Sequence, residues 1–257
     1  MGDLATEPSP SISDDEIRQR IASVPHWYHQ IEFRPGLVTP GINHTAPVLP
    51  LLALPADCTG LRVLDIGARD GYFSFEAERR GAQVLAVDYM PATQTGFHVA
   101  ASILGSRVEF RQENIYNLKP EEIGTFDVVL CLGLLYHLPD SMQALGIVRR
   151  LCSDVLCLET HVIDNELRMP DGSVRPMAEV APLLSNVPLM QFYAGESLNA
   201  DPTNYWGPNV ECLRQMLAES NFTVTDEVLK HNRVVMNCRV KADPRLDYFN
   251  RIARGVV

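Results

Sequence analysis

Short apolar runs alternate with helix-forming segments through the middle of the chain, from Leu61 to residue 162. The apolar runs occupy residues 62–67, 83–88, 107–114, 126–133 and 154–162, and the helical segments between them occupy 71–81, 91–104 and 139–151. The run at 126–133 is almost entirely apolar, as central strands of parallel sheets tend to be. This order of elements predicts an α/β fold with a doubly wound, mostly parallel sheet and right-handed crossovers.

A helix and two strands are expected after this alternating region. We expect the helix over residues 208–222, beginning at Pro208, and the two strands at FTVTDEVL and RVVMNCRV, joined at residues 230–232. Such a hairpin adds two strands to the five before it. The predicted fold is therefore a seven-stranded, Rossmann-like sheet with a terminal antiparallel hairpin.

The segments outside the sheet predict a cap and a lid. Ser13-Asp14-Asp15-Glu16 matches a capping box and predicts a helix that runs to about Val24. Pro35-Gly36 fits the centre of a type II turn, so IEF and LVT are expected to form a small hairpin. Residues 162–207 break the strand–helix rhythm. We expect a flexible tail at 1–12, a cap over the site at 13–58, the main domain at 59–243 with a lid at 162–207, and a C-terminal tail at 244–257.

The charge balance bears on the class of partner. The 257-residue chain has a net charge of −10, and lysine occurs only at positions 119, 230 and 241. Nucleic-acid binding depends on clustered cations, so this composition disfavours a nucleic-acid partner but leaves open a local arginine patch.

The cysteines and the N-terminus bear on location. Six scattered cysteines show no CxxC spacing, which favours free thiols in a reducing cytoplasm. The N-terminus lacks the basic start and apolar core of a secretory signal, and we expect no membrane span because no apolar run is long enough.

The stretch VLDIGARDGYFSF at residues 63–75 predicts a ligand-binding turn between a strand and a helix. Asp65 lies near the end of the strand, and Gly67 and Gly71 permit the turn. Ligands of open α/β sheets bind beyond the carboxyl ends of the strands. Asp88 ends the next strand and is placed to accept ribose hydroxyls, while Asn114 is placed to meet a base edge. The turn lacks GxGxxG spacing, so a cofactor without a pyrophosphate fits better than a dinucleotide.

These residues resemble the cofactor motifs of class I S-adenosylmethionine-dependent methyltransferases. Asp65, Gly67 and Gly71 match D/E-x-G-x-G-x-G, with Arg69 in place of the middle glycine, and Asp88 matches the acidic residue after the second strand. The resemblance implies S-adenosylmethionine as the cofactor and S-adenosylhomocysteine as the product. The predicted cofactor-binding residues are Asp65, Gly67, Arg69, Gly71, Asp88, Tyr89, Asn114, Ile115, Leu132 and Tyr136.

A narrower resemblance extends beyond this core. The segments WYHQIEF-x-x-GLVTPG, LGLLYHL and LETHVID look like those of tRNA wobble-uridine (5-oxyacetic acid pathway) methyltransferase-like proteins. This implies that the N-terminal hairpin covers the cofactor and that Tyr136 and Arg233 lie near its sulfonium. The carboxymethylating members place lysines before the first cofactor strand. This chain has none there, which favours ordinary S-adenosylmethionine unless Arg20 or Arg34 substitutes.

The predicted catalytic residues lie where strands four and five end. His137 follows the fourth strand, and Glu159 and His161 alternate along the fifth and therefore share a face. Each histidine is a candidate base or substrate ligand. The alternatives are structural: a helix-entry hydrogen bond for His137 and a strand-end hydrogen bond for His161.

The predicted acceptor wall consists largely of aromatic side chains. Tyr205 and Trp206 are the preferred pair, although lid aromatics equally well form the lid's own core. The full predicted substrate-binding set is Tyr28, Tyr193, Tyr205, Trp206 and Arg233. No metal site is expected, because the histidines around the N-terminal hairpin lack ligand spacing.

The sequence thus predicts a methyltransferase acting on an oxygen or nitrogen of a small molecule. Two alternatives stay open: modification of the tRNA wobble uridine, and a non-catalytic protein that binds S-adenosylmethionine. The sequence sets no oligomeric state, and a homodimer remains open.

Overall fold

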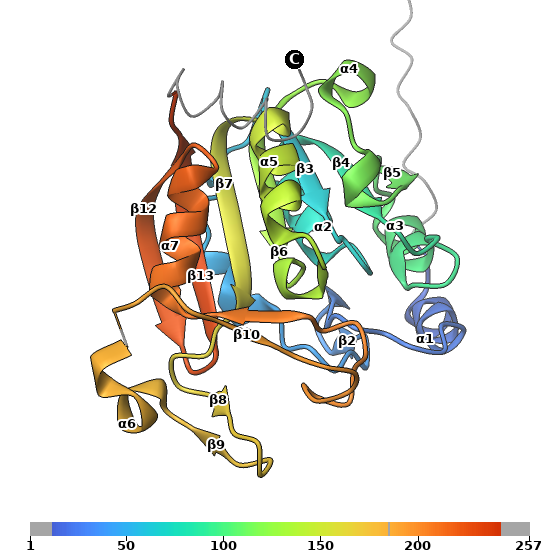
Figure 1. The fold of residues 1–257 in the computed structure, drawn as a ribbon. Helices are drawn as coiled ribbons and strands as arrows, with labels where there is room; N and C mark the ends of the chain where they lie inside the picture. The colour runs from blue at the N-terminus through green and yellow to red at the C-terminus, as the bar shows by residue number, and fades with distance from the viewer. Residues whose placement is uncertain (1–11, 185, 243–257) are drawn as a thin grey trace, which may run out of the picture.

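A central seven-stranded sheet organises the chain (Figure 1). The computed structural model describes residues 12–184 and 186–242, so nearly all of the two predicted tails lies outside the described residues. The strand order is β12-β13-β7-β6-β3-β4-β5. The bounds are β3 (Arg62–Ile66), β4 (Gln83–Asp88), β5 (Glu109–Gln112), β6 (Phe126–Leu132), β7 (Cys152–His161), β12 (Phe222–Lys230) and β13 (Arg233–Val240).

The sheet is mixed in the way that the sequence predicts. β3, β4, β5, β6 and β7 pair in parallel, whereas β13 lies antiparallel between β7 and β12. The predicted Rossmann-like sheet with a terminal antiparallel hairpin is therefore confirmed.

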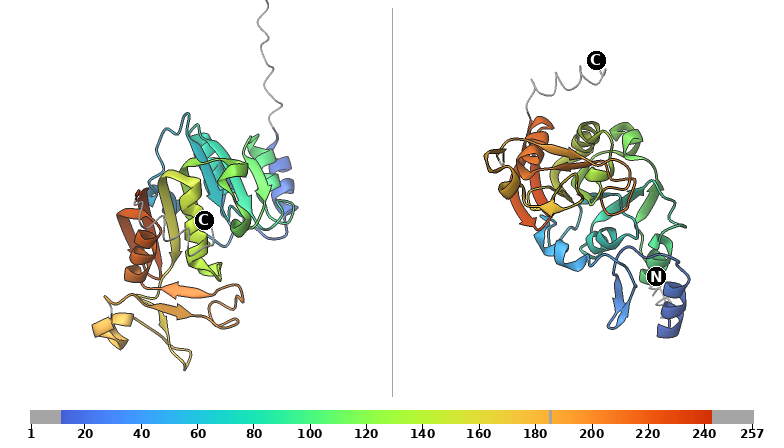
Figure 2. Two further views of the ribbon diagram at one scale, coloured as in Figure 1. Left: turned by 45° about the horizontal axis from the view of Figure 1, so that its top comes forward. Right: turned by 60° about the horizontal axis from the view of Figure 1, so that its bottom comes forward.

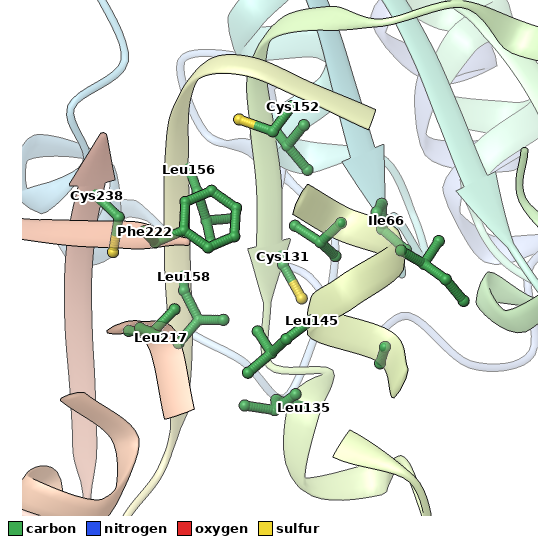
Figure 3. Close-up of a cluster of buried hydrophobic side chains, with 14 of the residues drawn as sticks. Ile66, Cys131, Leu135, Leu145, Cys152, Leu156, Leu158, Leu217, Phe222 and Cys238 are labelled. Atoms are coloured by element: carbon green, nitrogen blue, oxygen red, sulfur yellow. The ribbon is translucent and has the colours of Figure 1, made fainter. Parts of the chain in front are cut away.

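Helices cover both faces of the sheet, because successive side chains of a strand point to opposite faces. On β6, Val129 and Cys131 join the cluster under α5 (Ser141–Leu151) and α7 (Val210–Glu219). Figure 3 shows side chains of both helices meeting those of β6 and β7 there. Val128 and Leu130 instead pack in the cluster that contains α2 (Tyr72–Arg79). The core thus lies in two layers on either side of the sheet.

The predicted N-terminal helix and hairpin are both present, with a shorter helix. Helix α1 (Asp14–Ala22) begins after Ser13, whose side chain accepts a hydrogen bond from the Glu16 amide, and ends two residues before the expected Val24. The hairpin of β1 (Glu32–Arg34) and β2 (Leu37–Val38) follows. The 3₁₀ helix η1 (Ala46–Leu51) then leads into the sheet.

Two predicted helix starts are wrong. α3 (Phe97–Leu104) begins six residues after Pro91, because residues 91–94 form a turn and the Gly96 amide is held by the carboxylate of Asp70. α7 begins after Asn209, whose side chain caps it by accepting from the Cys212 amide. Pro208 instead ends strand β11 (Trp206–Pro208).

The segment predicted as a lid contains local structure that the sequence did not predict. It forms two small hairpins and a small apolar core of Ile163, Met177, Tyr193 and Leu198. Its elements are β8 (Leu167–Arg168), β9 (Val174–Arg175), α6 (Met177–Val180), η4 (Pro182–Leu184), β10 (Met190–Phe192) and β11. The short elements η2 (Ile115–Asn117), α4 (Pro120–Ile123) and η3 (Leu135–His137) complete the described fold.

Both the lid segment and the N-terminal hairpin lie at the edge of the sheet where the parallel strands end (Figures 1 and 2). That edge is where open α/β sheets bind ligands. No helix among the residues that the structure describes combines the length and the apolar character that a membrane crossing needs.

Candidate cofactor and acceptor site

The turn between β3 and α2 has the backbone of a glycine-rich loop. Gly67, Arg69 and Gly71 have φ angles of 81°, 53° and 87°, all in the left-handed region. At Gly71 an added Cβ would also come within 2.6 Å of the Phe75 ring. Arg69 therefore replaces the family's middle glycine in the sequence while keeping a conformation that side chains disfavour.

The side chain of Arg69 points along the end of β4. Its guanidinium contacts the sulfur of Met90. Burial raises the pKa of the nearby Asp88 carboxyl, and the charge of Arg69 opposes part of that rise. The direction of Arg69, which the sequence did not determine, is therefore toward the segment that follows Asp88.

Two buried carboxylates lie at the ends of β3 and β4. Asp65 accepts a hydrogen bond of 2.6 Å from the Ser74 hydroxyl, and burial raises its pKa to about 6. In Asp88 one oxygen accepts from the Arg69 amide and the other from the Met90 amide, each at 2.9 Å. A carboxylate has about four acceptor sites, so each Asp88 oxygen keeps capacity for a ligand hydroxyl. Asp88 thus fits the ribose diol of an S-adenosyl cofactor.

The other predicted cofactor residues surround these strand ends. Tyr89 is 65% exposed beside Asp88. The Asn114 side-chain oxygen caps η2 by accepting from the Tyr116 amide, and Ile115 packs into the core. Leu132 ends β6 and is half-buried. Their contacts with a cofactor stay predictions.

Asp70, which the sequence analysis did not single out, connects the loop to the N-terminal segment. It is fully buried, and its carboxylate accepts hydrogen bonds from the amides of Tyr28 (2.6 Å), His29 (2.8 Å) and Gly96 (2.8 Å). An aspartate before a glycine is common in turns, so the sequence carries no signal of this role.

The lid segment engages both histidines proposed as bases. His137 Nδ1 lies 2.9 Å from the Thr203 hydroxyl, and burial lowers the pKa of His137. His161 Nε2 lies 2.8 Å from the Tyr193 hydroxyl, and burial lowers the pKa of His161 to about 4. These contacts favour the structural alternative for each histidine.

Of the predicted lid aromatics, Tyr193 and Trp206 use their side chains within the protein, whereas Tyr205 is held through its backbone. Tyr193 is buried in the lid's small core. The Tyr205 amide donates to the Tyr136 carbonyl, and the Trp206 indole donates to the Pro139 carbonyl. These contacts fasten the lid segment to η3 and to the residues that follow it.

Glu159 and Arg233 form a bidentate ion pair beside Tyr136. Arg233 Nε and Nη2 lie 2.5 and 2.6 Å from the two Glu159 oxygens, and the guanidinium lies 4.7 Å from the centre of the Tyr136 ring. Glu159 is therefore occupied by Arg233, and neither is a free charge.

A cavity of about 530 Å³ lies between the N-terminal segment and the ends of β6, β7, β12 and β13. It includes four predicted site residues, Tyr28, Leu132, Glu159 and Arg233, and none of the lid aromatics predicted as the acceptor wall. Its other lining residues among those described are His29, Ile42, Asn43, His44, Thr45, Pro47, Val48, Leu51, Phe73, Gly133, Val228, Lys230 and Val235.

His29 is a second residue that the sequence analysis did not assign to the site. Its side chain is 5% exposed, and its Nδ1 has no hydrogen-bond partner. Burial lowers the pKa of His29 to about 4, so the ring is neutral at pH 7. Within the described residues no group of three or more metal-ligating side chains is close enough to hold an ion.

Comparisons with known proteins agree with this geometry. The methyltransferase domain family model matches residues 64–154. The ubiquinone biosynthesis O-methyltransferase of Xanthomonas axonopodis pv. citri (strain 306) is 34% identical over 97 residues, which are 38% of this chain and 39% of that protein. The match therefore spans about two fifths of the length of that relative.

Solved structures show the same fold at low sequence identity. The N-terminal domain of EvdMO1, solved with S-adenosylhomocysteine (SAH) and D-fucose, superposes with a TM-score of 0.62 at 18% identity, over 92% of this chain and 100% of that one. Magnesium protoporphyrin IX methyltransferase (ChlM) from Synechocystis PCC 6803, with bound S-adenosylmethionine, gives 0.52 at 15% identity, over 77% and 78%. Residues 64–154 therefore match a methyltransferase domain, and the described chain shares its fold with these solved structures.

Proposed function

We propose that the protein transfers the methyl group of S-adenosylmethionine to an oxygen of a small-molecule acceptor. The observation that carries the proposal is the β3–α2 loop, with three left-handed residues beside the Asp88 carboxylate. The relatives named as O-methyltransferases support oxygen rather than nitrogen as the receiving atom. Nitrogen remains the alternative acceptor atom.

The loop suits a cofactor without phosphates. The turn between β3 and α2 reads GARDG and lacks the GxGxxG spacing that brings backbone amides against a pyrophosphate. S-adenosylmethionine supplies an activated methyl group on a cationic sulfonium. The chain's own residues then have to bind and orient the cofactor and the acceptor and to exclude water. Such positioning accounts for much of the rate of group transfer.

Ordinary S-adenosylmethionine is supported over a carboxylated form. Arg20 and Arg34 were the possible substitutes for the missing lysines, and they pair with Glu16 and Asp14 at 2.6 Å. Arg233 is neutralised by Glu159. An extra carboxylate on the cofactor would therefore meet no unpaired cation among these three arginines.

The same pairing supports a small molecule over tRNA. The chain carries a net charge of −10. An RNA groove requires cations free to meet phosphates, and Arg233, the arginine that lines the cavity, is already paired. The tRNA alternative therefore gains no support from the site.

We also propose the roles of the segments around the site. Residues 13–58 form a cap, supported by the bonds from Tyr28 and His29 to Asp70, and residues 162–207 form a lid within a methyltransferase domain of 59–243. A cytoplasmic location is part of the same proposal, supported by six free thiols that a reducing compartment would preserve.

Transfer of labelled methyl groups tests the proposal. The protein is mixed with S-adenosylmethionine carrying a labelled methyl group and with the small-molecule fraction of a cell extract, and bulk tRNA is run in parallel. We expect label in a small molecule. Label in tRNA would favour the wobble-uridine alternative, and cofactor binding without label in either fraction would favour the non-catalytic alternative.

A further inference from the structure

The cavity beneath the N-terminal segment has the build of a small-molecule site. Its volume of about 530 Å³ lies within the range of about 300–1,000 Å³ that is typical of ligand pockets. It reaches Leu132 and Gly133 at the end of β6 on one side and Val228 on the edge strand β12 on the other. It therefore extends from the strand ends of the cofactor site toward the outer edge of the sheet.

The inner wall of this cavity carries a neutral histidine ring. The side chain of His29 is 5% exposed, and burial lowers the pKa of His29 to about 4. Its backbone amide donates to the Asp70 carboxylate, which holds the backbone of the wall at this point. Its Nδ1 makes no hydrogen bond and is buried among protein atoms, so it lies out of reach of a ligand in the cavity.

The charges of the cavity wall do not cancel completely. Glu159 and Arg233 cancel one another. Lys230 lies at the exposed end of β12 and has no carboxylate partner among residues 12–184 and 186–242. One formal positive charge thus remains at the rim of the cavity in a chain with a net charge of −10. The rest of the wall is largely apolar and includes Val48, Leu51, Phe73 and Val235.

We propose that this cavity binds the methyl acceptor, a small molecule with an apolar body and an anionic group that meets Lys230. The inference rests on the proposed methyltransferase function and adds the location and chemical class of the acceptor. It also moves the acceptor away from the lid, because the Tyr193 side chain is buried in the lid's small core and the Trp206 indole bonds to the Pro139 carbonyl.

Two neighbouring residues of β12 offer a matched test of the location. Val228 lines the cavity, whereas Leu229 does not and is 41% exposed. Val228→Trp places an indole inside the cavity, and Leu229→Trp adds the same group outside it. We expect Val228→Trp to lower labelling of the small-molecule fraction at least tenfold, with Leu229→Trp unchanged. Calorimetry with SAH should give the same affinity for both variants and for the wild type.

The labelled product tests the chemical class. It should bind to an anion-exchange resin at pH 7, and loss of that binding after phosphatase treatment would identify the anionic group as a phosphate rather than a carboxylate. Lys230→Ala should lower labelling several-fold at limiting extract, whereas Lys241→Ala, a lysine outside the cavity, should not.

Three results would overturn the inference. Full labelling by Val228→Trp would remove the acceptor from this cavity, most clearly if Trp206→Ala abolished labelling instead. A labelled product that is not anionic would refute the class. Wild-type protein that binds SAH but labels nothing would refute the proposed function itself, and this inference with it.

Discussion

Replacing Asp70 by alanine should destabilise the protein more than any surface substitution, because Asp70 joins three parts of the chain. Its buried carboxylate accepts hydrogen bonds of 2.6 to 2.8 Å from the backbone amides of Tyr28, His29 and Gly96. Hydrogen bonds to a charged group contribute about 1.5–3 kcal/mol each, so simple addition would give roughly 4.5–9 kcal/mol. Relaxation of the surrounding protein and entry of water into the site recover part of this lost free energy. We therefore expect a loss of about 3–5 kcal/mol, a large share of the 5–15 kcal/mol typical of a domain.

Urea unfolding followed by circular dichroism measures this loss, and the fluorescence of Trp27 reports on the segment that Asp70 holds. Trp27 is 5% exposed and directly precedes the two amides. The control is Asp57→Ala, an exposed aspartate whose hydrogen bonds are local ones from Thr59 and whose loss should cost less than about 1 kcal/mol. If Asp70→Ala is also within about 1 kcal/mol of wild type, the cap is not held to the loop in this way.

Three further predictions concern the loop and the lid. Because Arg69 has a φ of 53°, Arg69→Gly should raise the melting temperature by about 2–4 °C, and Arg69→Val should lower it. Equal melting temperatures of the two variants would contradict a left-handed backbone at this position. Tyr193→Phe removes the bond to buried His161 and should cost about 1–3 kcal/mol in urea unfolding, and a cost near zero would show that the two side chains are not joined. Burial lowers the pKa of His161 from 6.5 to about 4, so the unfolded state binds a proton at a higher pH than the folded state does. The contribution of His161 to the free energy of unfolding is therefore complete above pH 6.5. It falls as the pH drops toward 4, by up to about 3 kcal/mol. The pH dependence of unfolding should be shallower in His161→Phe, and identical slopes would refute this.

The elements predicted well from sequence are those that depend on local spacing. The order of strands and helices followed from alternating apolar runs, and the turn around Gly67 and Gly71 followed from glycine spacing next to Asp65. Arg69 departs in sequence from the glycine of the motif that the turn resembles, but its backbone takes the left-handed conformation that glycine favours.

The features that were missed depend on contacts between distant segments. Pro91 is a reasonable helix start by local rules, but the bond from Gly96 to Asp70 delays the helix. The cavity forms only when the N-terminal segment packs against β12 and β13, nearly two hundred residues later in the chain. The sequence therefore gave no reason to place the acceptor near His29 rather than beside the lid aromatics, where local composition pointed.

Calorimetric titration of SAH into the wild-type protein and into Asp88→Ala tests the central claim most directly. The account predicts one binding site in the wild type. It predicts an affinity weaker by about 1–3 kcal/mol in the variant, because ribose hydroxyls lose a charged acceptor. The titration is run under conditions where both proteins are folded, because Asp88 also accepts hydrogen bonds from the amides of Arg69 and Met90, and their loss lowers the stability of the variant. No binding to the wild type, or equal binding to both proteins, would contradict the cofactor site described above.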